Sequence, residues 1–386
     1  MTRWFQGALI LPDRIVENGL LAVAGGRIAG LWDLEREPAP EADPRRTERL
    51  ERGYIAPGYI DLHVHGGGGA DFMDGDPEAV AVITAAHART GTTGLLATTL
   101  TGPEEALLQA FRAARTAPRR GARILGFHVE GPFINLKMKG AQDERYIRPA
   151  SVAEIDRWLA EGGPDHRWHV TLAPETGGAL DAIRHLAARG AVVSAGHTDC
   201  TYAQLQQATE AGLAHATHLF NAMRGLHHRE PGTVGGALTL PGMTVEVIAD
   251  GVHVHPAALA AAVRARGPGQ VLLVTDAMRA AGLGDGEYLL GELRAVVRGA
   301  EARLADGTLA GSVLTMEQAV QNMVRWAGVD LVTAVAMASL HPARLHRLEG
   351  RKGSLAPGKD ADLLLLDSDL SVLTTLVEGE VVHDRR

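Results

Sequence analysis

Residues 59–65 read YIDLHVH. This largely apolar run predicts a buried strand, and it ends in two histidines. Because successive side chains of a strand point to opposite faces, His63 and His65 share one face and can converge on a single ion. Imidazole is a common ligand of divalent metals. A single histidine at this place could be a structural residue of the dry core. Two histidines on the same face of a strand are harder to explain in that way.

Seven further β-rich runs follow this segment, and helix-like segments separate them. Such alternation is typical of a parallel sheet with crossover helices. Eight strands within residues 55–345 fit a (β/α)8 barrel, whose active site lies at the carboxyl ends of the strands. The predicted strands are 59–65, 94–100, 123–130, 168–173, 191–197, 214–219, 245–250 and 271–276.

Capping residues and helical periodicity predict the helices. Thr101 and Ser151 each precede a glutamate by three residues, the spelling of a capping box. Gly190 closes a helical pattern that begins at residue 180. The predicted helices with regular patterns are 180–188, 256–266, 316–326 and 331–339.

The two chain ends have a different pattern. Short apolar runs alternate with turn signals in residues 1–54 and again in residues 346–386, which favours antiparallel strands. We therefore expect both ends to form one small β-sandwich beside a barrel of residues 55–345. The charged stretch 35–52 is predicted to be a surface loop of that module.

Composition limits the class of protein. Of 386 residues, 46% are hydrophobic and 22% are charged, which argues against wholesale disorder. Lys+Arg 38 minus Asp+Glu 46 gives −8, a balance that favours neither nucleic acid nor an anionic membrane as partner. With a single cysteine, no apolar run of membrane-spanning length and no cationic leader, the expected location is the cytoplasm.

Polar residues stand where the predicted strands end. Glu130 ends the third strand, His197 the fifth and His218 the sixth. Taken singly, each of these three residues could equally be a structural residue held by a hydrogen bond or a metal ligand. Together with the histidine pair of the first strand, four imidazoles and a carboxylate at one barrel mouth match the nitrogen and oxygen donors of a zinc site.

Three other residues are candidates for proton transfer and substrate binding. Asp276, after the last strand, is either the N-cap of the next segment or a general base toward a water that the metal activates. His253 either packs in a loop or stabilises the oxygen of a tetrahedral intermediate. Arg229 is a solvated surface charge unless the substrate carries phosphate, which arginine binds in bidentate fashion.

Several longer motifs extend this pattern over nearly the whole chain. They are HVEGPF at 128–133, SAGHT at 194–198, HATHLFNAM at 215–223, REPG at 229–232, ADGVH at 249–253, VTDA at 274–277, LAGS at 309–312 and GSLAPGKDAD at 353–362. With these motifs the sequence resembles the amidohydrolase superfamily and, within it, the N-acetylglucosamine-6-phosphate deacetylases. The His-x-His pair identifies only the superfamily, whereas the other motifs together are more specific.

The resemblance implies a metal-dependent hydrolase barrel inserted in a small β-sandwich. It also implies hydrolysis of the acetamide of N-acetyl-D-glucosamine 6-phosphate to glucosamine 6-phosphate and acetate, in amino-sugar catabolism and cell-wall recycling. Glu130, His197 and His218 would be the principal metal ligands, and His63 and His65 would hold a second ion. Zn²⁺ is the expected metal, as one or two ions, with Fe²⁺, Mn²⁺ and Co²⁺ as alternatives. Relatives are commonly homodimers with the loop of the REPG motif near the partner subunit.

The resemblance also assigns the residues around the substrate. Asp276 would be the acid/base, His253 would polarise the acetamide, and the phosphate would lie near Asn221, the backbone of Ala222 and Arg229. Where many relatives have a histidine that touches the sugar, this chain has Gln142, which cannot become cationic. The expected substrate-binding residues are Ala141, Gln142, Asn221, Ala222, His228, Arg229, His253, Leu309, Ala310 and Gly311.

Three alternatives stay open at this point. The substrate could be another N-acetylhexosamine 6-phosphate, such as N-acetylgalactosamine 6-phosphate, since Gln142 differs. A cyclic-amide hydrolase of the same superfamily would usually bridge two metals with a carboxylated lysine, but the third strand ends in Glu130, and Lys137 and Lys139 lie beyond it. A non-catalytic sugar-phosphate-binding protein would be expected to lack Asp276 or a metal ligand.

Overall fold

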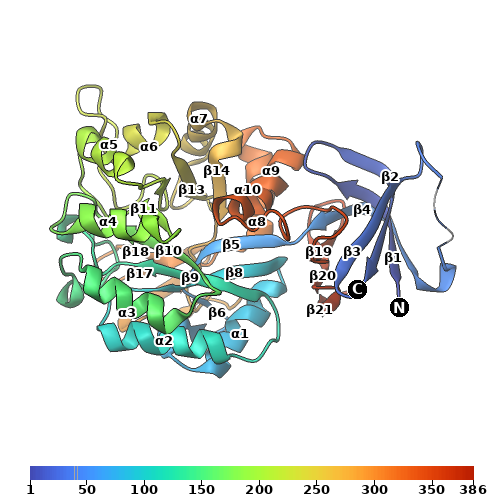
Figure 1. Ribbon diagram of the computed structural model, residues 1–386, viewed down its shortest axis with the longest axis horizontal. Coiled ribbons are helices and arrows are strands. Elements are labelled where there is room, and N and C mark those ends of the chain that lie inside the picture. Colours follow the sequence, from blue (N-terminus) through green and yellow to red (C-terminus); the bar gives the residue numbers. More distant parts are fainter. Residues whose placement is uncertain (39, 41) are drawn as a thin grey trace.

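The structure, a computed structural model, describes residues 1–38, 40 and 42–386. A barrel forms the larger part, and a small β-module that contains both termini lies beside it (Figure 1). The barrel consists of eight parallel strands, each hydrogen-bonded to the next. They are β5 (Tyr59–Val64), β8 (Thr92–Thr99), β9 (Arg123–Glu130), β10 (Arg167–Leu172), β11 (Val192–Ala195), β12 (His215–Ala216), β13 (Thr244–Ile248) and β14 (Val271–Val274).

The barrel closes where the last strand meets the first. A parallel bridge joins Val64 to Ala277, and the backbone N–H of Asp276 donates to the carbonyl of His63 at 2.9 Å. All eight predicted strands are present in the predicted order, so the predicted fold class is confirmed.

Helices cover the outside of the barrel (Figure 1). The predicted helix 256–266 is found with the predicted bounds, whereas 316–326 divides into a helix and a π-helical turn, Met323–Ala327. None of the helices in the described part of the chain is long and apolar enough to cross a membrane. The helices are α1 (Pro77–Ala88), α2 (Glu104–Thr116), α3 (Val152–Gly162), α4 (Ala179–Ala188), α5 (Tyr202–Glu210), α6 (Gly232–Thr239), α7 (Pro256–Arg266), α8 (Met316–Asn322), α9 (Leu331–Ala338) and α10 (Leu340–Leu345).

The two predicted capping boxes form incompletely. Helix α2 begins after Pro103 without a side-chain cap, so the prediction that Thr101 caps it is wrong. Thr101 instead lies buried at the barrel mouth, where its backbone N–H donates to Gln142. At α3 the hydroxyl of Ser151 accepts from the N–H of Glu154, but the Glu154 carboxylate pairs with Arg148 rather than returning to the cap.

Both chain ends contribute to one seven-stranded sheet, in the order β21-β20-β19-β4-β1-β2-β3. Its buried residues form a core of their own. The division of the chain at residues 54 and 345 stays a prediction. The strands are β1 (Arg3–Ile10), β2 (Ile15–Ala24), β3 (Arg27–Asp33), β4 (Thr47–Pro57), β19 (Leu363–Leu366), β20 (Val372–Val377) and β21 (Glu380–Asp384).

The prediction of a loop over residues 35–52 is wrong at its end. Residues 47–52 belong to β4, because Thr47 and the residues after it pair in parallel with β1. Charged side chains are compatible with such a strand since one of its faces is open to water. Residues 39 and 41 of the predicted loop lie outside the described residues.

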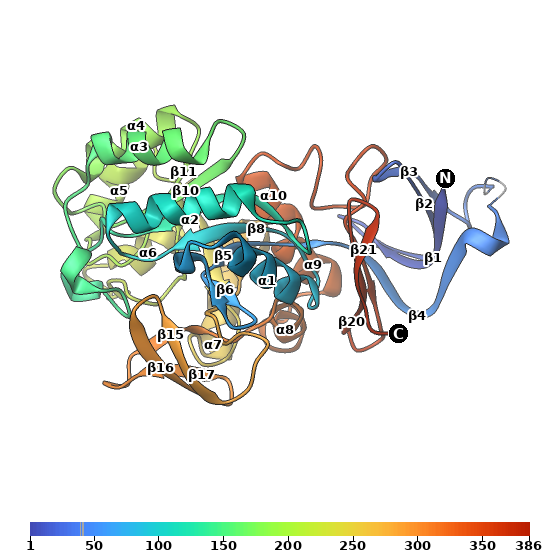
Figure 2. The ribbon, with the colours of Figure 1, turned by 90° about the horizontal axis from the view of Figure 1, so that it is seen from below.

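An antiparallel sheet that the sequence did not suggest lies between β14 and α8. Figure 2 shows it beside the barrel, below the small strand β6 (Gly66–Gly67), which pairs with β7 (Ala70–Asp71). Its apolar face packs on Leu100 and Met278, and its last strand carries the predicted substrate-binding residues of the LAGS motif. The sheet is formed by β15 (Gly286–Leu290), β16 (Leu293–Arg298), β17 (Glu301–Leu304) and β18 (Leu309–Ser312).

A buried ion pair ties the segment after α10 to the β-module. Lys352 is 6% exposed, and its Nζ lies 2.7 Å from Asp362 and 3.1 Å from Asp360. Burial lowers the pKa of Lys352, but Asp362 and Asp360 more than offset this, so its pKa is raised. Asp362 also accepts from the N–H of Glu378, and its carbonyl accepts from Gly58 at the start of the barrel.

We expect Lys352→Met to lower the free energy of unfolding by about 3–5 kcal/mol, since it leaves the buried Asp362 without its cation, whereas Asp360 keeps Arg351 at 2.9 Å. Urea denaturation measures the change. The exposed Arg325 on the outer surface gives a control, and Arg325→Met should change stability by less than about 0.5 kcal/mol. Equal stability of the two variants would show that the ion pair does not hold the module.

Candidate metal centre

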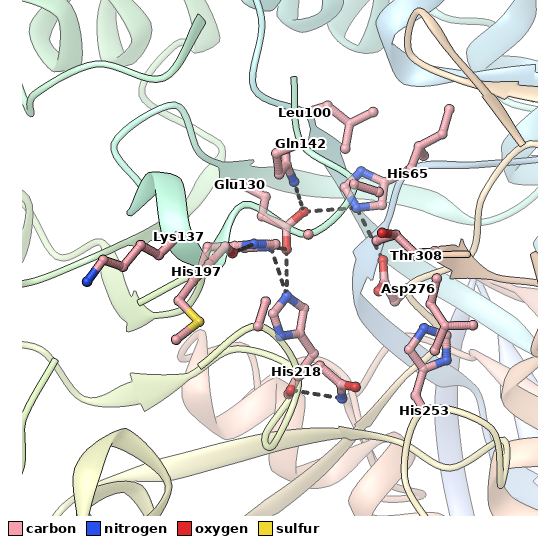
Figure 3. Close-up of a pocket in the computed structure, with 18 residues that line it drawn as sticks. His65, Leu100, Glu130, Lys137, Gln142, His197, His218, His253, Asp276 and Thr308 are labelled. Atoms are coloured by element: carbon pink, nitrogen blue, oxygen red, sulfur yellow. Dashed lines mark hydrogen bonds and ion pairs between the residues drawn. The ribbon is translucent and has the colours of Figure 1, made fainter. Parts of the chain in front are cut away.

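The carboxyl ends of the barrel strands surround a pocket of about 280 Å³. Figure 3 shows the imidazoles of His65, His197 and His218 and the carboxylates of Glu130 and Asp276 turned toward one another inside it. His63 lies fully buried directly beneath them. The predicted site residues that line the pocket are His65, Glu130, Ala141, Gln142, His197, His218, Asn221, Ala222, His253, Asp276, Leu309 and Gly311.

Besides the buried His63, three predicted site residues do not line the pocket. Ala310 is fully buried beside it. His228 and Arg229 lie on an exposed loop before α6, where the Arg229 guanidinium is 2.8 Å from Nε2 of His228. A single chain therefore does not bring Arg229 to the pocket, and its assignment to the phosphate stays a prediction.

The carboxylate of Glu130 lies between two pairs of histidines. Its Oε1 is 3.2 Å from Nε2 of His197 and 3.0 Å from Nε2 of His218. The same oxygen is 3.3 Å from His63, and Oε2 is 3.2 Å from His65. Glu130 thus connects one group of donors, formed with His197 and His218, to a second group of His63, His65 and Asp276.

The hydrogen bonds at Nδ1 of His197 and His63 determine what can lie between the Nε2 atoms of these rings and the Glu130 carboxylate. Nδ1 of His197 donates to the carbonyl of Met138 at 2.9 Å, and Nδ1 of His63 donates to Glu246 at 2.7 Å. A neutral imidazole carries one N–H, so both Nε2 atoms are acceptors, and both face the acceptor Glu130. Either a proton on Nε2 or a cation between these atoms relieves this repulsion, and the set of nitrogen and oxygen donors fits a divalent metal such as Zn²⁺.

Three site residues have a strained backbone. The φ angles of His197, His218 and Asp276 are 48°, 32° and 50°, in the left-handed region that non-glycine residues rarely adopt. Each residue lies two positions after the last residue of its strand, so the predicted strands 191–197, 214–219 and 271–276 are too long. Such strain costs about 1–3 kcal/mol per residue and persists only where the surroundings enforce it.

Asp276 faces the second group of donors. Its Oδ1 lies 3.2 Å from His65 and 3.4 Å from His63, and no helix follows it, so the N-cap interpretation is wrong. Burial raises the pKa of the Asp276 carboxyl, but His63 and His65 more than offset this, and the pKa is lowered. The group is therefore ionised at neutral pH, as a general base must be.

His253 is held by a carboxylate on its own loop. Asp250 accepts from Nδ1 of His253 at 2.6 Å and from the backbone N–H groups of Val252 and His253 at 2.8 Å each. Burial lowers the pKa of His253, but the bond to Asp250 and the nearby Asp276 outweigh burial and the repulsion from Arg303, and the pKa is raised. Because Nδ1 is committed to Asp250, Nε2 can donate into the pocket only while the ring is protonated.

We therefore expect activity to fall as the pH rises through the pKa of His253, since the donor is present only below it. Asp250→Asn removes the charge that raises this pKa, so the alkaline limb of kcat/KM against pH should move to lower pH. Asp285→Asn removes an equal charge from an exposed loop and should leave that limb in place. An unmoved limb in Asp250→Asn would contradict the assigned role of His253.

Sequence reasoning missed several residues of the site. Lys137 and Thr308 line the pocket, the first from the loop after β9 and the second from the turn before β18. Glu246 stands among the buried apolar residues Val245, Val247 and Ile248 of its strand, and this interruption was a signal that could have found it. Gln142 was assigned to the sugar, but its amide donates to Glu130 at 2.7 Å while its oxygen accepts from Thr101 at 2.7 Å.

A closed parallel barrel with imidazoles and carboxylates converging at its mouth defines a class of metal-dependent hydrolases. Residues 54–382 match the amidohydrolase family, and the chain belongs to this family. The resemblance that the sequence motifs indicated is thereby confirmed.

The chain is similar to particular deacetylases over nearly its whole length. It is 38% identical over 380 residues to N-acetylglucosamine-6-phosphate deacetylase of Bacillus subtilis, covering 97% of this chain and 95% of that protein. It is 40% identical to N-acetylgalactosamine-6-phosphate deacetylase of Escherichia coli O157:H7, covering 97% of each. A mutant N-acetyl-D-glucosamine-6-phosphate deacetylase of Mycobacterium smegmatis, solved in complex with N-acetyl-D-glucosamine-6-phosphate, superposes with a TM-score of 0.92 at 36% identity and 99% coverage of both chains.

Proposed function

We propose that the chain hydrolyses the acetamide of N-acetyl-D-glucosamine 6-phosphate to glucosamine 6-phosphate and acetate. The observation that carries this proposal is the convergence of Glu130, four imidazoles and the Asp276 carboxylate on one pocket. The similarity to the Bacillus subtilis deacetylase, at 38% identity, supports the choice of substrate.

The residues of the pocket divide the reaction between them. A divalent metal ion held by Glu130, His197 and His218 would supply a Lewis acid that activates water and polarises the acetamide carbonyl. Asp276 takes the proton of the attacking water as the new C–O bond forms. It returns this proton to the nitrogen as the C–N bond breaks, so the amine leaves neutral. Protonated His253 donates to the carbonyl oxygen, where negative charge develops.

Finer assignments belong to the same proposal. The nitrogen and oxygen donor set supports Zn²⁺, and a second ion at His63 and His65 is supported by the two donor groups that share Glu130. Leu226, which is 60% exposed beside the Arg229 loop, supports a homodimer that covers this loop. The single cysteine, Cys200, is buried and free, which suits the cytoplasm.

Asp276→Asn should lower kcat by about 10²–10⁴-fold, because an amide cannot accept the proton of water. Acetate release from N-acetylglucosamine 6-phosphate measures the loss, and a chelator should abolish the activity of the wild-type protein. Metal content of the variant must be measured alongside. Near-normal turnover of Asp276→Asn with its metal in place would rule out the assigned base.

One other substrate is a second candidate. The relative from Escherichia coli acts on N-acetylgalactosamine 6-phosphate according to its name, and Gln142 is engaged by Glu130 and Thr101 rather than free to read the sugar. The 6-phosphates of N-acetylglucosamine, N-acetylgalactosamine and N-acetylmannosamine, each beside its unphosphorylated form, separate these substrates. A cyclic-amide hydrolase is disfavoured because Lys137 is 80% exposed and Lys139 pairs with Glu144.

Arg229→Ala should lower kcat/KM for the phosphorylated sugar by about tenfold or more, since charge-assisted bonds to phosphate contribute about 1.5–3 kcal/mol each. It should scarcely change activity on the sugar without phosphate. Lys137→Ala is the informative comparison, because Lys137 lines the pocket of its own chain whereas Arg229 does not. If Arg229→Ala affects both sugars equally, or neither, Arg229 does not bind the phosphate.

A further inference from the structure

A buried carboxylate that the proposed reaction does not use lies beneath the pocket. Glu246 stands on β13 in the run TVEVI, residues 244–248, and its side chain is fully buried inside the barrel. Taking a carboxylate out of water costs several kcal/mol unless hydrogen bonds or a cation compensate. The partners of Glu246 therefore indicate why a charged residue is kept there.

Each partner of Glu246 belongs to the site or supports it. Oε1 accepts from Nδ1 of His63 at 2.7 Å and from the backbone N–H of His218 at 3.0 Å. Oε2 lies 3.3 Å from Nε2 of His215, whose Nδ1 is 2.6 Å from the hydroxyl of Thr244. One carboxylate oxygen thus contacts a ligand candidate from each of the two donor groups.

The two contacts on Oε1 have different consequences. The bond to His63 fixes the proton on Nδ1 and leaves Nε2 free to face the second donor group, as a carboxylate behind a metal-binding histidine does. The hydrogen bond from His218 holds the backbone of that residue in place, and this backbone has a φ of 32°, in the strained left-handed region. The Glu246 carbonyl also accepts from the N–H of Leu219 at 2.9 Å, so the side chain and backbone of Glu246 hold two successive residues of the strained turn.

We propose that Glu246 is a positioning residue that couples the two metal sites, orienting His63 toward the second ion and fixing the backbone that presents His218 to the first. The proposal rests on the proposed function insofar as that function needs the ions. It adds a residue that touches neither substrate nor metal.

A third group of potential ligands, His169, His215 and Glu246, lies in the same buried layer, with donor atoms within 4.8 Å of one another. The Glu246 carboxylate already serves His63, His218 and His215 in the hydrogen bonds described above. Because Thr244 can donate to Nδ1 of His215, the Nε2–H of His215 can donate to Glu246 without any metal. We therefore assign this group to the support of Glu246, and a third bound ion becomes an outcome of the test.

Two substitutions separate orientation from packing. Glu246→Gln keeps the shape and one acceptor oxygen for His63 and His218 but loses the charge, so the dissociation constant of the second ion should rise about tenfold. Glu246→Leu fills similar space but loses both bonds, so this constant should rise about 100-fold and that of the first ion about tenfold. Ser194→Ala is the matched control, because Ser194 is fully buried in the same barrel interior and bonds to Thr217 rather than to a ligand.

The experiment is a Zn²⁺ titration of each metal-stripped protein in competition with a chromophoric chelator, with zinc counted per chain. Wild type and Ser194→Ala should bind two ions with unchanged affinities. Glu246→Gln should bind its second ion more weakly, as should His63→Ala, and circular dichroism of the metal-free proteins checks that they are folded. Because zinc is counted without substrate, failure of the proposed deacetylation would not affect this result.

Three results would overturn the proposal. The first is that both Glu246 variants bind zinc as Ser194→Ala does. The second is that wild type binds a single ion, so that there is nothing to couple. The third is a third ion per chain that is lost in His169→Leu, which would make Glu246 a ligand. If Glu246→Leu does not fold, Glu246→Gln alone decides, because the proposal requires its second ion to weaken more than its first.

Discussion

The site depends on one constraint: imidazole nitrogens face carboxylate oxygens at about 3 Å among nearly fully buried side chains. Glu130 is in contact with His63, His65, His197 and His218, and it is nearly fully buried. Acceptors in such an arrangement repel unless a proton or a metal cation lies between them. The hydrogen bonds behind the rings hold a proton on Nδ1 of His197 and of His63, so both Nε2 atoms are free to bind a metal.

The barrel meets this constraint by placing the ligands at or just beyond the carboxyl ends of its strands. Strained backbones at His197 and His218 turn the side chains into the mouth, and contacts from other elements hold these turns. Strain of this kind is found at functional sites because only a rigid surrounding structure can enforce it. The added hairpin sheet β15–β18 then completes one wall of the pocket.

The sequence predicts the strands and the order of the ligands because both depend on local patterns. An apolar run followed by a histidine or a carboxylate identifies β9 with Glu130 without any knowledge of packing. The hairpin sheet of residues 286–312 was missed because its short, half-exposed strands lack such a pattern. The partners of Glu246 could not be predicted either, since His63 and His215 meet it only when the barrel closes. For the same reason, the distance of Arg229 from the pocket appears only in three dimensions.

The central claim is that one carboxylate, Glu130, joins two ion sites. Crystals of the zinc-loaded protein, measured on either side of the zinc absorption edge, test it most directly. The account predicts two anomalous peaks, one among Glu130, His197 and His218 and the other among Glu130, His63 and His65. A map with a single peak beside Glu130, or with zinc bound only elsewhere in the chain, would contradict it.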